Sequence, residues 1–183
     1  MATNKDTAGS NPFSSILSPL YRETIRSLLV FAPSMMIVGL IMGVIDREIA
    51  RKIPYSEVPG GDNIEASLSI KILHGHIILL GGVIPLLMAL MLFLSRVVGV
   101  QEMPEGWLKW SVRLYRLGLL ETLVLQFAKG VQYVAFVGDG PDLNFQDVDS
   151  RLFISKAIRH SLYGIGHMTA FFGLIGFCFA MAK

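Results

Sequence analysis

Four long apolar blocks constrain this chain more than any other feature of its sequence. They lie at residues 27–45, 70–94, 107–137 and 153–182, and charged segments separate them. A helix needs about 20 apolar residues to cross a bilayer, and each block is close to that length or longer. Lipid offers the backbone no hydrogen-bond partner, and no block alternates with the period of two expected of a barrel strand. The sequence therefore predicts an all-α integral membrane protein with four transmembrane helices in an up-down bundle.

The composition favours the same class. Of the 183 residues, 52% are hydrophobic and only 16% are charged, whereas soluble domains carry about 25% charged residues. A net charge of +2 without a basic run argues against nucleic-acid binding. We expect one membrane domain over residues 1–183, with a polar N-terminal tail at 1–26 and no cleaved signal peptide.

The orientation in the membrane follows from charge. Lys and Arg divide almost equally between the two sides of a four-span chain, while the acidic residues favour the segments 46–67 and 137–150. The positive-inside rule counts only Lys and Arg, so its signal here is weak. We expect a multi-pass protein of a prokaryotic cytoplasmic membrane, with both termini in the cytoplasm.

Small residues and one proline mark the places where the helices should pack or bend. Gly39 and Gly43 form a GxxxG pair in the first block, and glycines recur through the last block, a pattern typical of close helix–helix packing. Pro85 cannot donate a hydrogen bond to the carbonyl of Gly81, so we expect a kink or a water-lined gap there. Three glycines beside histidines also leave room for the edge of a flat cofactor: Gly75, Gly164 and Gly166.

All four histidines lie at or inside the apolar blocks: His74, His76, His160 and His167. Ionisable residues at membrane depth are costly and are usually functional. The second and fourth blocks enter the membrane from the same side. At about 1.5 Å per residue, His76 and His167 should differ in depth by only a few Å, as should His74 and His160.

The spacing of the histidines restricts which of them can share a ligand. Residues i and i+2 of a helix are about 200° apart, so His74 and His76 should face opposite ways and serve different partners. His160 and His167 should lie on one face, about 10 Å apart along the axis, which is too far for one metal ion.

The arrangement that satisfies these limits is a b-type haem held by one histidine from each block. Imidazole is a common axial ligand of haem, and helix bundles hold cofactors between their helices. We expect His76 and His167 to be the axial pair, with His74 and His160 as the alternative pair, giving one or two haem b groups. Lys71, Lys156 and Arg159 lie at the same interface and could pair with haem propionates.

A local resemblance supports haem binding. The segment LHGHIILLGG at 73–82 resembles the histidine-X-histidine helix of the catalytic subunit of haem–copper oxidases and nitric oxide reductases. In that family the two histidines point in opposite directions, each toward one of two haems, which would assign such roles to His74 and His76. The resemblance covers about 25 residues. The adjacent histidine pair and the upstream histidine that would hold copper or non-haem iron are absent from this sequence.

The third block carries a polar stripe of Glu121, Gln126, Lys129, Gln132 and Tyr133 within about 140° of a helical wheel. Such a stripe should face protein, water or a cofactor, because lipid would not accommodate it. A cofactor or proton role and an interface with another subunit both explain it. We expect Arg113 and Arg116 to extend toward headgroups, and Trp107 and Trp110 to sit in the aromatic belt.

Three hypotheses follow, and none assigns a catalytic residue. The first is a haem b subunit that carries electrons within a respiratory-type complex, between quinol and a partner, so that any enzymatic role is at most that of an oxidoreductase subunit. The second is a non-haem copper or iron site built from His74 or His76 with His160, His167 and Glu121. The third is a structural subunit of a larger membrane complex. Cys178 is the only cysteine, so cysteine-based metal sites are excluded.

Overall fold

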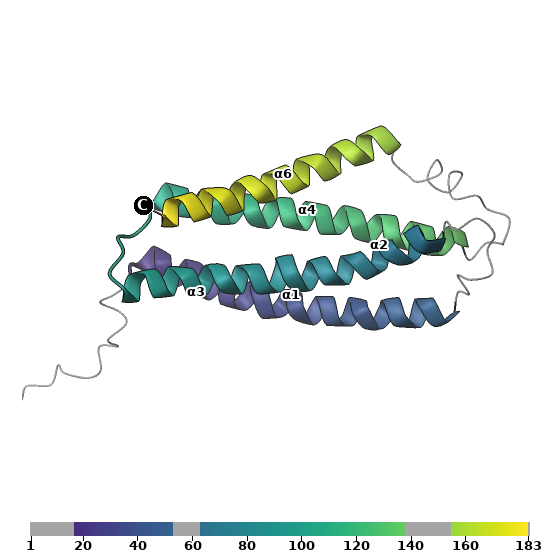
Figure 1. The fold of residues 1–183 in the computed structure, drawn as a ribbon, viewed down its shortest axis with the longest axis horizontal. Coiled ribbons are helices and arrows are strands. Elements are labelled where there is room, and N and C mark those ends of the chain that lie inside the picture. The colour runs from purple at the N-terminus through teal and green to yellow at the C-terminus, as the bar shows by residue number, and fades with distance from the viewer. Residues whose placement is uncertain (1–16, 53–62, 138–154, 183) are drawn as a thin grey trace, which may run out of the picture.

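The computed structural model describes residues 17–52, 63–137 and 155–182, and these residues are almost entirely helical. The helices are α1 (Pro19–Lys52), α2 (Asn63–His76), the π-helix η2 (Ile77–Val83), α3 (Ile84–Val97), α4 (Glu105–Val137) and α6 (Lys156–Met181). Because α2, η2 and α3 follow one another without a break, they form one continuous rod, and four long rods lie side by side (Figure 1).

Three helical stretches are long and apolar enough to cross a membrane: Pro19–Ile49, Ile70–Val97 and Lys156–Met181. This confirms the prediction of an all-helical, multi-pass membrane protein. Helix α4 is 33 residues long but is not among these stretches, since Glu121, Gln126, Lys129 and Gln132 interrupt its apolar run. Helix α1 and the continuous α2–η2–α3 segment extend beyond the predicted blocks at both ends, and α4 begins two residues before its block.

Several predicted segments fall partly or wholly outside the described residues. The polar tail at 1–26 is described only from residue 17, and the fourth block is described from residue 155. The centre of the segment 46–67 and nearly all of the segment 137–150 lie outside them as well.

Glycines set the two closest helix crossings. A Cβ atom on Gly173 of α6 would lie 2.7 Å from the carbonyl oxygen of Ser111 in α4 and still closer to the backbone of Tyr115. On the other side of the molecule, a Cβ on Gly39 of α1 would lie 3.2 Å from a side-chain carbon of Ile77. The glycines therefore allow close packing, as predicted, and the GxxxG pair of α1 packs against another helix of the same chain.

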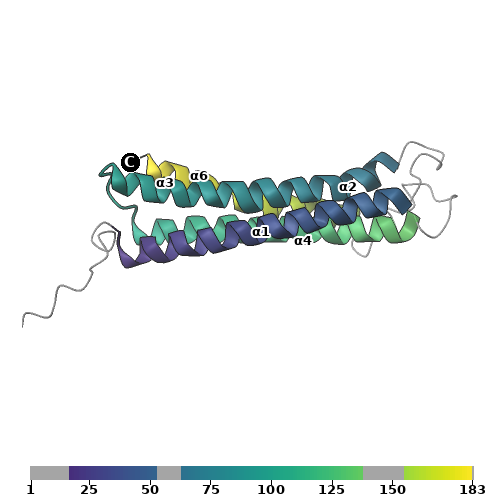
Figure 2. The same cartoon turned by 90° about the horizontal axis from the view of Figure 1, so that it is seen from below.

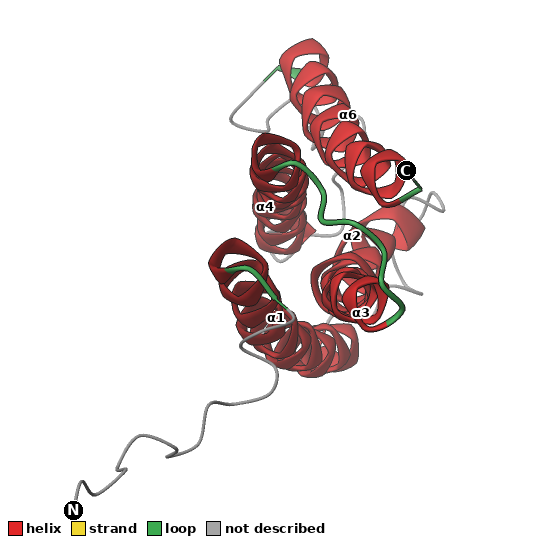
Figure 3. Ribbon diagram, turned by 90° about the vertical axis from the view of Figure 1, so that its left-hand side faces the viewer, coloured by secondary structure: helices red, strands yellow, loops and turns green. Residues whose placement is uncertain are grey.

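The rods associate as two pairs. Helix α6 packs along α4, and α1 packs along the α2–η2–α3 rod, while α4 also contacts α2. Figure 3 shows α6 beside α4 and α3 beside α1, and in the view of Figure 2 α1 overlaps α4. Contacts between α6 and the α2–η2–α3 rod are sparse. The two pairs face each other across a cavity that lies between α6 and the rod that carries His74 and His76.

Candidate functional site

His76 and His167 line one cavity. His76 is the last residue of α2, and His167 lies near the middle of α6. The cavity measures about 160 Å³, and the rest of its lining comes from η2, α4 and α6: Leu80, Tyr115, Leu119, Thr122, Leu123, Ala170, Phe171 and Leu174. The lining is largely apolar, so the two imidazoles are its principal polar groups. The structure thus brings together two residues that are 91 positions apart in the sequence.

Backbone hydrogen bonds select the tautomer of both rings when the imidazoles are neutral. Nδ1 of His76 lies 2.9 Å from the carbonyl oxygen of Ile72, and Nδ1 of His167 lies 2.8 Å from that of Tyr163. A carbonyl can only accept a hydrogen bond, so in the neutral imidazole each Nδ1 must carry the proton and donate it. Nε2 then keeps its lone pair. This is the state of a metal-ligating histidine, whose other ring nitrogen commonly donates to a carbonyl.

Open space adjoins both histidines. Helix α6 diverges from the other rods toward its N-terminal end (Figure 1), on the same side as the cavity. A Cβ atom added at Gly75 or Gly164 would meet nothing within 4 Å. Gly166 behaves differently, because its Cβ would lie 2.7 Å from the hydroxyl of Thr122. Of the three predicted glycines, Gly75 and Gly164 leave room beside the histidines and Gly166 serves packing against α4.

A π-helix and a tyrosine hold the segment after His76. The N–H of Ile84 donates to the carbonyl of Leu79, five residues earlier. In this register the next donor would be Pro85, which has no N–H, so the carbonyl of Leu80 lacks its backbone partner. The hydroxyl of Tyr115 in α4 donates to that carbonyl at 2.5 Å. The unpaired carbonyl that Pro85 causes is therefore that of Leu80 and not that of Gly81, one residue later. The hydroxyl of Tyr115 occupies the position where a gap was predicted.

We predict that Tyr115→Phe destabilises the protein by about 1–3 kcal/mol, because it leaves a buried carbonyl without a donor. Pro85→Ala supplies an N–H that can donate to Leu80, so the double variant should recover most of this loss. Thermal unfolding of the four proteins in detergent measures the coupling. Additive effects of the two substitutions would contradict the assignment.

His74 and His160 lie outside the cavity. The ring of His74 faces α1, where a Cβ on Gly43 would lie 3.6 Å from its Cδ2. Its Nδ1 is buried and has no hydrogen-bond partner in the part of the chain that the structure describes. His160 is exposed on α6. His74 and His76 thus face different neighbours, and the structure shows no partner from α6 beside His74.

Lys156 and Arg159 lie in the first turn of α6, and Lys71 lies in the second half of α2, five residues before His76. Lys71 and Lys156 are exposed, whereas Arg159 is only 6% exposed. Arg159 lies one helical turn before Tyr163, whose carbonyl fixes the ring of His167. It is therefore the cation whose helix position and burial best suit a charged group of a cofactor held by His167.

The polar stripe of α4 faces other helices. Glu121, Gln126, Lys129 and Gln132 are all half-buried. The carboxyl carbon of Glu121 lies 3.5 Å from the position of a Cβ on Gly166, so this residue faces α6 beside His167. Gln126 and Lys129 interact with other groups of the chain, and Oε1 of Gln132 is buried. The side chain of Tyr133 lies outside the described residues.

The comparison with protein families gives one match, which spans residues 25–183 and is described as a protein of unknown function, DUF2871. The chain belongs to the DUF2871 family. No curated protein and no solved structure matches it. For this DUF2871 member, function therefore has to be argued from the site.

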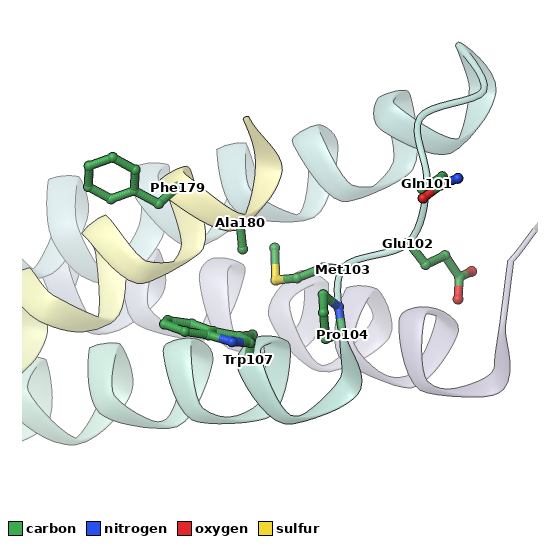
Figure 4. Close-up of a pocket in the computed structure, with 7 residues that line it drawn as sticks. All are labelled: Gln101, Glu102, Met103, Pro104, Trp107, Phe179 and Ala180. Carbon is green, nitrogen blue, oxygen red and sulfur yellow. The ribbon is translucent and has the colours of Figure 1, made fainter. Parts of the chain in front are cut away.

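A second cavity of about 290 Å³ lies at the opposite end of this DUF2871 chain, where the connection after α3 meets the end of α6 (Figure 4). Met103, Trp107 and Ala180 border it, while Gln101 and Glu102 point away from Trp107. The carboxylate of Glu102 accepts the N–H of Ser18 at 3.0 Å and pairs with Arg96 at 3.5 Å. This acid therefore holds the connection in place.

No group of three or more His, Cys, Asp or Glu side chains able to hold a metal ion occurs within residues 17–52, 63–137 and 155–182. Cys178 is exposed. Sequence reasoning missed Tyr115 as a site residue, although Pro85 signalled that some carbonyl would need a side-chain donor.

Proposed function

We propose that this chain is a haem b-binding membrane subunit that carries electrons, with His76 and His167 as the axial ligands. One observation supports this most strongly. Imidazoles from two rods that barely touch each other line the same apolar cavity, and each has its Nδ1 proton engaged by a carbonyl. Two neutral imidazoles with free Nε2 atoms are the ligand set of a bis-histidine haem.

The surroundings of the two histidines fit a flat macrocycle. The cavity measures about 160 Å³, and Gly75 and Gly164, which lie close to the two histidines along their helices, would each carry a Cβ atom without meeting any atom within 4 Å. Leu80, Leu119 and Leu123 would exclude water from the ligands, which tunes the reduction potential of an iron site. When bound, haem b supplies reversible one-electron chemistry. Arg159 and Lys71 would pair with its propionates.

The proposal includes a four-span up-down bundle. Helix α4 is long enough to cross a bilayer, and its polar residues are half-buried against other helices, which removes the main objection to a fourth span. Both termini then lie on one side, which we assign to the cytoplasm of a prokaryotic cell. Other membrane subunits and quinol are the proposed redox partners.

The histidine-X-histidine resemblance supports haem binding. Among the described residues, His76 shares a cavity with a second histidine, whereas His74 faces Gly43 of α1. We therefore propose a single haem b and assign no oxygen or nitric oxide chemistry.

The test is a reduced-minus-oxidised visible spectrum of the purified full-length protein, produced in cells supplied with haem. We expect a b-type α-band and about one haem per chain by pyridine haemochrome. A haem-free protein that contains copper or iron would favour the non-haem metal site. A protein with neither haem nor metal would leave the structural subunit as the explanation.

A further inference from the structure

Arg116 of α4 is a half-buried cation that the proposed haem site does not use. Its sequence position predicts that it extends along its own helix, whereas in the structure it reaches across to α1. Its Nη1 donates to the hydroxyl of Ser27 at 2.9 Å, and its guanidinium lies over the ring of Phe31, 4.9 Å from the centroid. The side chain is therefore held in one orientation by two residues that are more than 80 positions away.

The remaining donors of this guanidinium are unused. Nε and Nη2 are both buried and have no hydrogen-bond partner among the described residues. These two nitrogens form one edge of the planar group, and that edge matches two oxygens of a phosphate or carboxylate. A buried cation without a counter-ion is costly, more so beside lipid. Glu23, one turn before Ser27, is exposed and does not fill this edge.

The location indicates which anion is available. Ser27 and Phe31 lie in the membrane-spanning stretch of α1, and their contacts with Arg116 join α1 to α4 in this region. Two further arginines of α1 are exposed toward the same end of the molecule: Arg22 and Arg26. Basic sites between transmembrane helices near a membrane surface attract anionic headgroups. Exposed Leu29 and Val30 offer an adjacent surface for acyl chains.

We infer that the Nε–Nη2 edge of Arg116 binds the phosphate of an anionic phospholipid between α1 and α4. Ser27 and Phe31 orient the guanidinium, and the lipid neutralises it and fills the contact between the two helices. This site is separate from the His76–His167 cavity and does not depend on the proposed function.

The experiment is native mass spectrometry of the full-length protein released from vesicles of phosphatidylcholine mixed with phosphatidylglycerol. Wild type should retain one phosphatidylglycerol molecule in preference to phosphatidylcholine. Arg116→Gln should weaken that retention about tenfold or more, because it removes a charged bidentate contact. Arg116→Lys, which keeps the charge but loses the paired edge, should also weaken it. Arg113→Gln, an exposed arginine one turn earlier, is the matched control and should bind as wild type does.

Four results would overturn the inference. The first is equal binding of the two lipids by wild type, a result that does not depend on the folding of any variant. Arg113→Gln losing the lipid as fully as Arg116→Gln would indicate only general surface attraction. A third test compares how strongly inorganic phosphate and short-chain phosphatidylglycerol stabilise wild type in lipid-free detergent. Equal stabilisation by the two would indicate a site for a free anion. Binding of a carboxylate from another protein to this edge of Arg116, in place of lipid, would also contradict the inference.

Discussion

Replacing either His76 or His167 with alanine will abolish the low-spin haem spectrum and reduce bound haem. The two imidazoles line one cavity from two rods, so each substitution removes one of the two proposed axial bonds. Loss of a hydrogen bond to a ligating residue typically weakens metal binding 10–100-fold, and loss of the ligand itself should cost at least about a hundredfold. Haem content and the Soret position of the purified variants measure the effect.

The other two histidines are the matched controls for this experiment. His160 lies on the same helix as His167 but does not line the cavity, and His74 is two residues from His76 but faces α1. His160→Ala and His74→Ala should therefore retain a low-spin haem at wild-type stoichiometry. Loss of haem in His74→Ala with retention in His76→Ala would transfer the ligand role to His74 and contradict the proposed pair.

The second large effect is expected at the α4–α6 crossing. A side chain at Gly173 would collide with the backbone of Ser111 and Tyr115, and backbone cannot move aside as a flexible side chain can. We expect Gly173→Leu to destabilise the protein by about 3 kcal/mol, at the upper end of the usual cost of overpacking. Because α6 is anchored mainly by α4, the substitution should also displace His167 and reduce haem binding.

Gly106→Ala separates this steric effect from the general effect of replacing a glycine in a helix. A Cβ on Gly106, in the first turn of α4, would meet nothing within 4 Å. Alanine there should be neutral or stabilising by up to about 1 kcal/mol. Thermal unfolding in detergent compares the variants. A Gly173→Leu protein as stable as wild type would show that the close crossing is not required.

The sequence was sufficient to predict the helical membrane class, because apolar length is a local property that each block carries by itself. It also predicted that His76 and His167 lie at similar depths in the membrane, because the helical rise per residue converts a position in the sequence into a distance along the helix axis. It could not show that they share a cavity. That depends on how α6 packs on α4 and on the cavity that this packing leaves beside α2. The glycine contacts that set this packing appear only in the three-dimensional structure.

Two site features were beyond sequence reasoning for identifiable physical reasons. Pro85 indicated an unpaired carbonyl, but the π-register moved that carbonyl from Gly81 to Leu80 and the donor, Tyr115, comes from another helix. Arg116 was expected to extend along its own helix toward headgroups. Its actual partners, Ser27 and Phe31, come from α1, and no local pattern in α4 indicates them.

The most direct test of the central claim is the low-temperature electron paramagnetic resonance spectrum of the oxidised full-length protein. Two imidazole ligands give a low-spin ferric haem, so we predict a low-spin signal at about one spin per chain in wild type, replaced by a high-spin signal in any haem that His76→Ala or His167→Ala retains. A wild-type spectrum with only high-spin haem, or with no haem signal at all, would contradict coordination by His76 and His167.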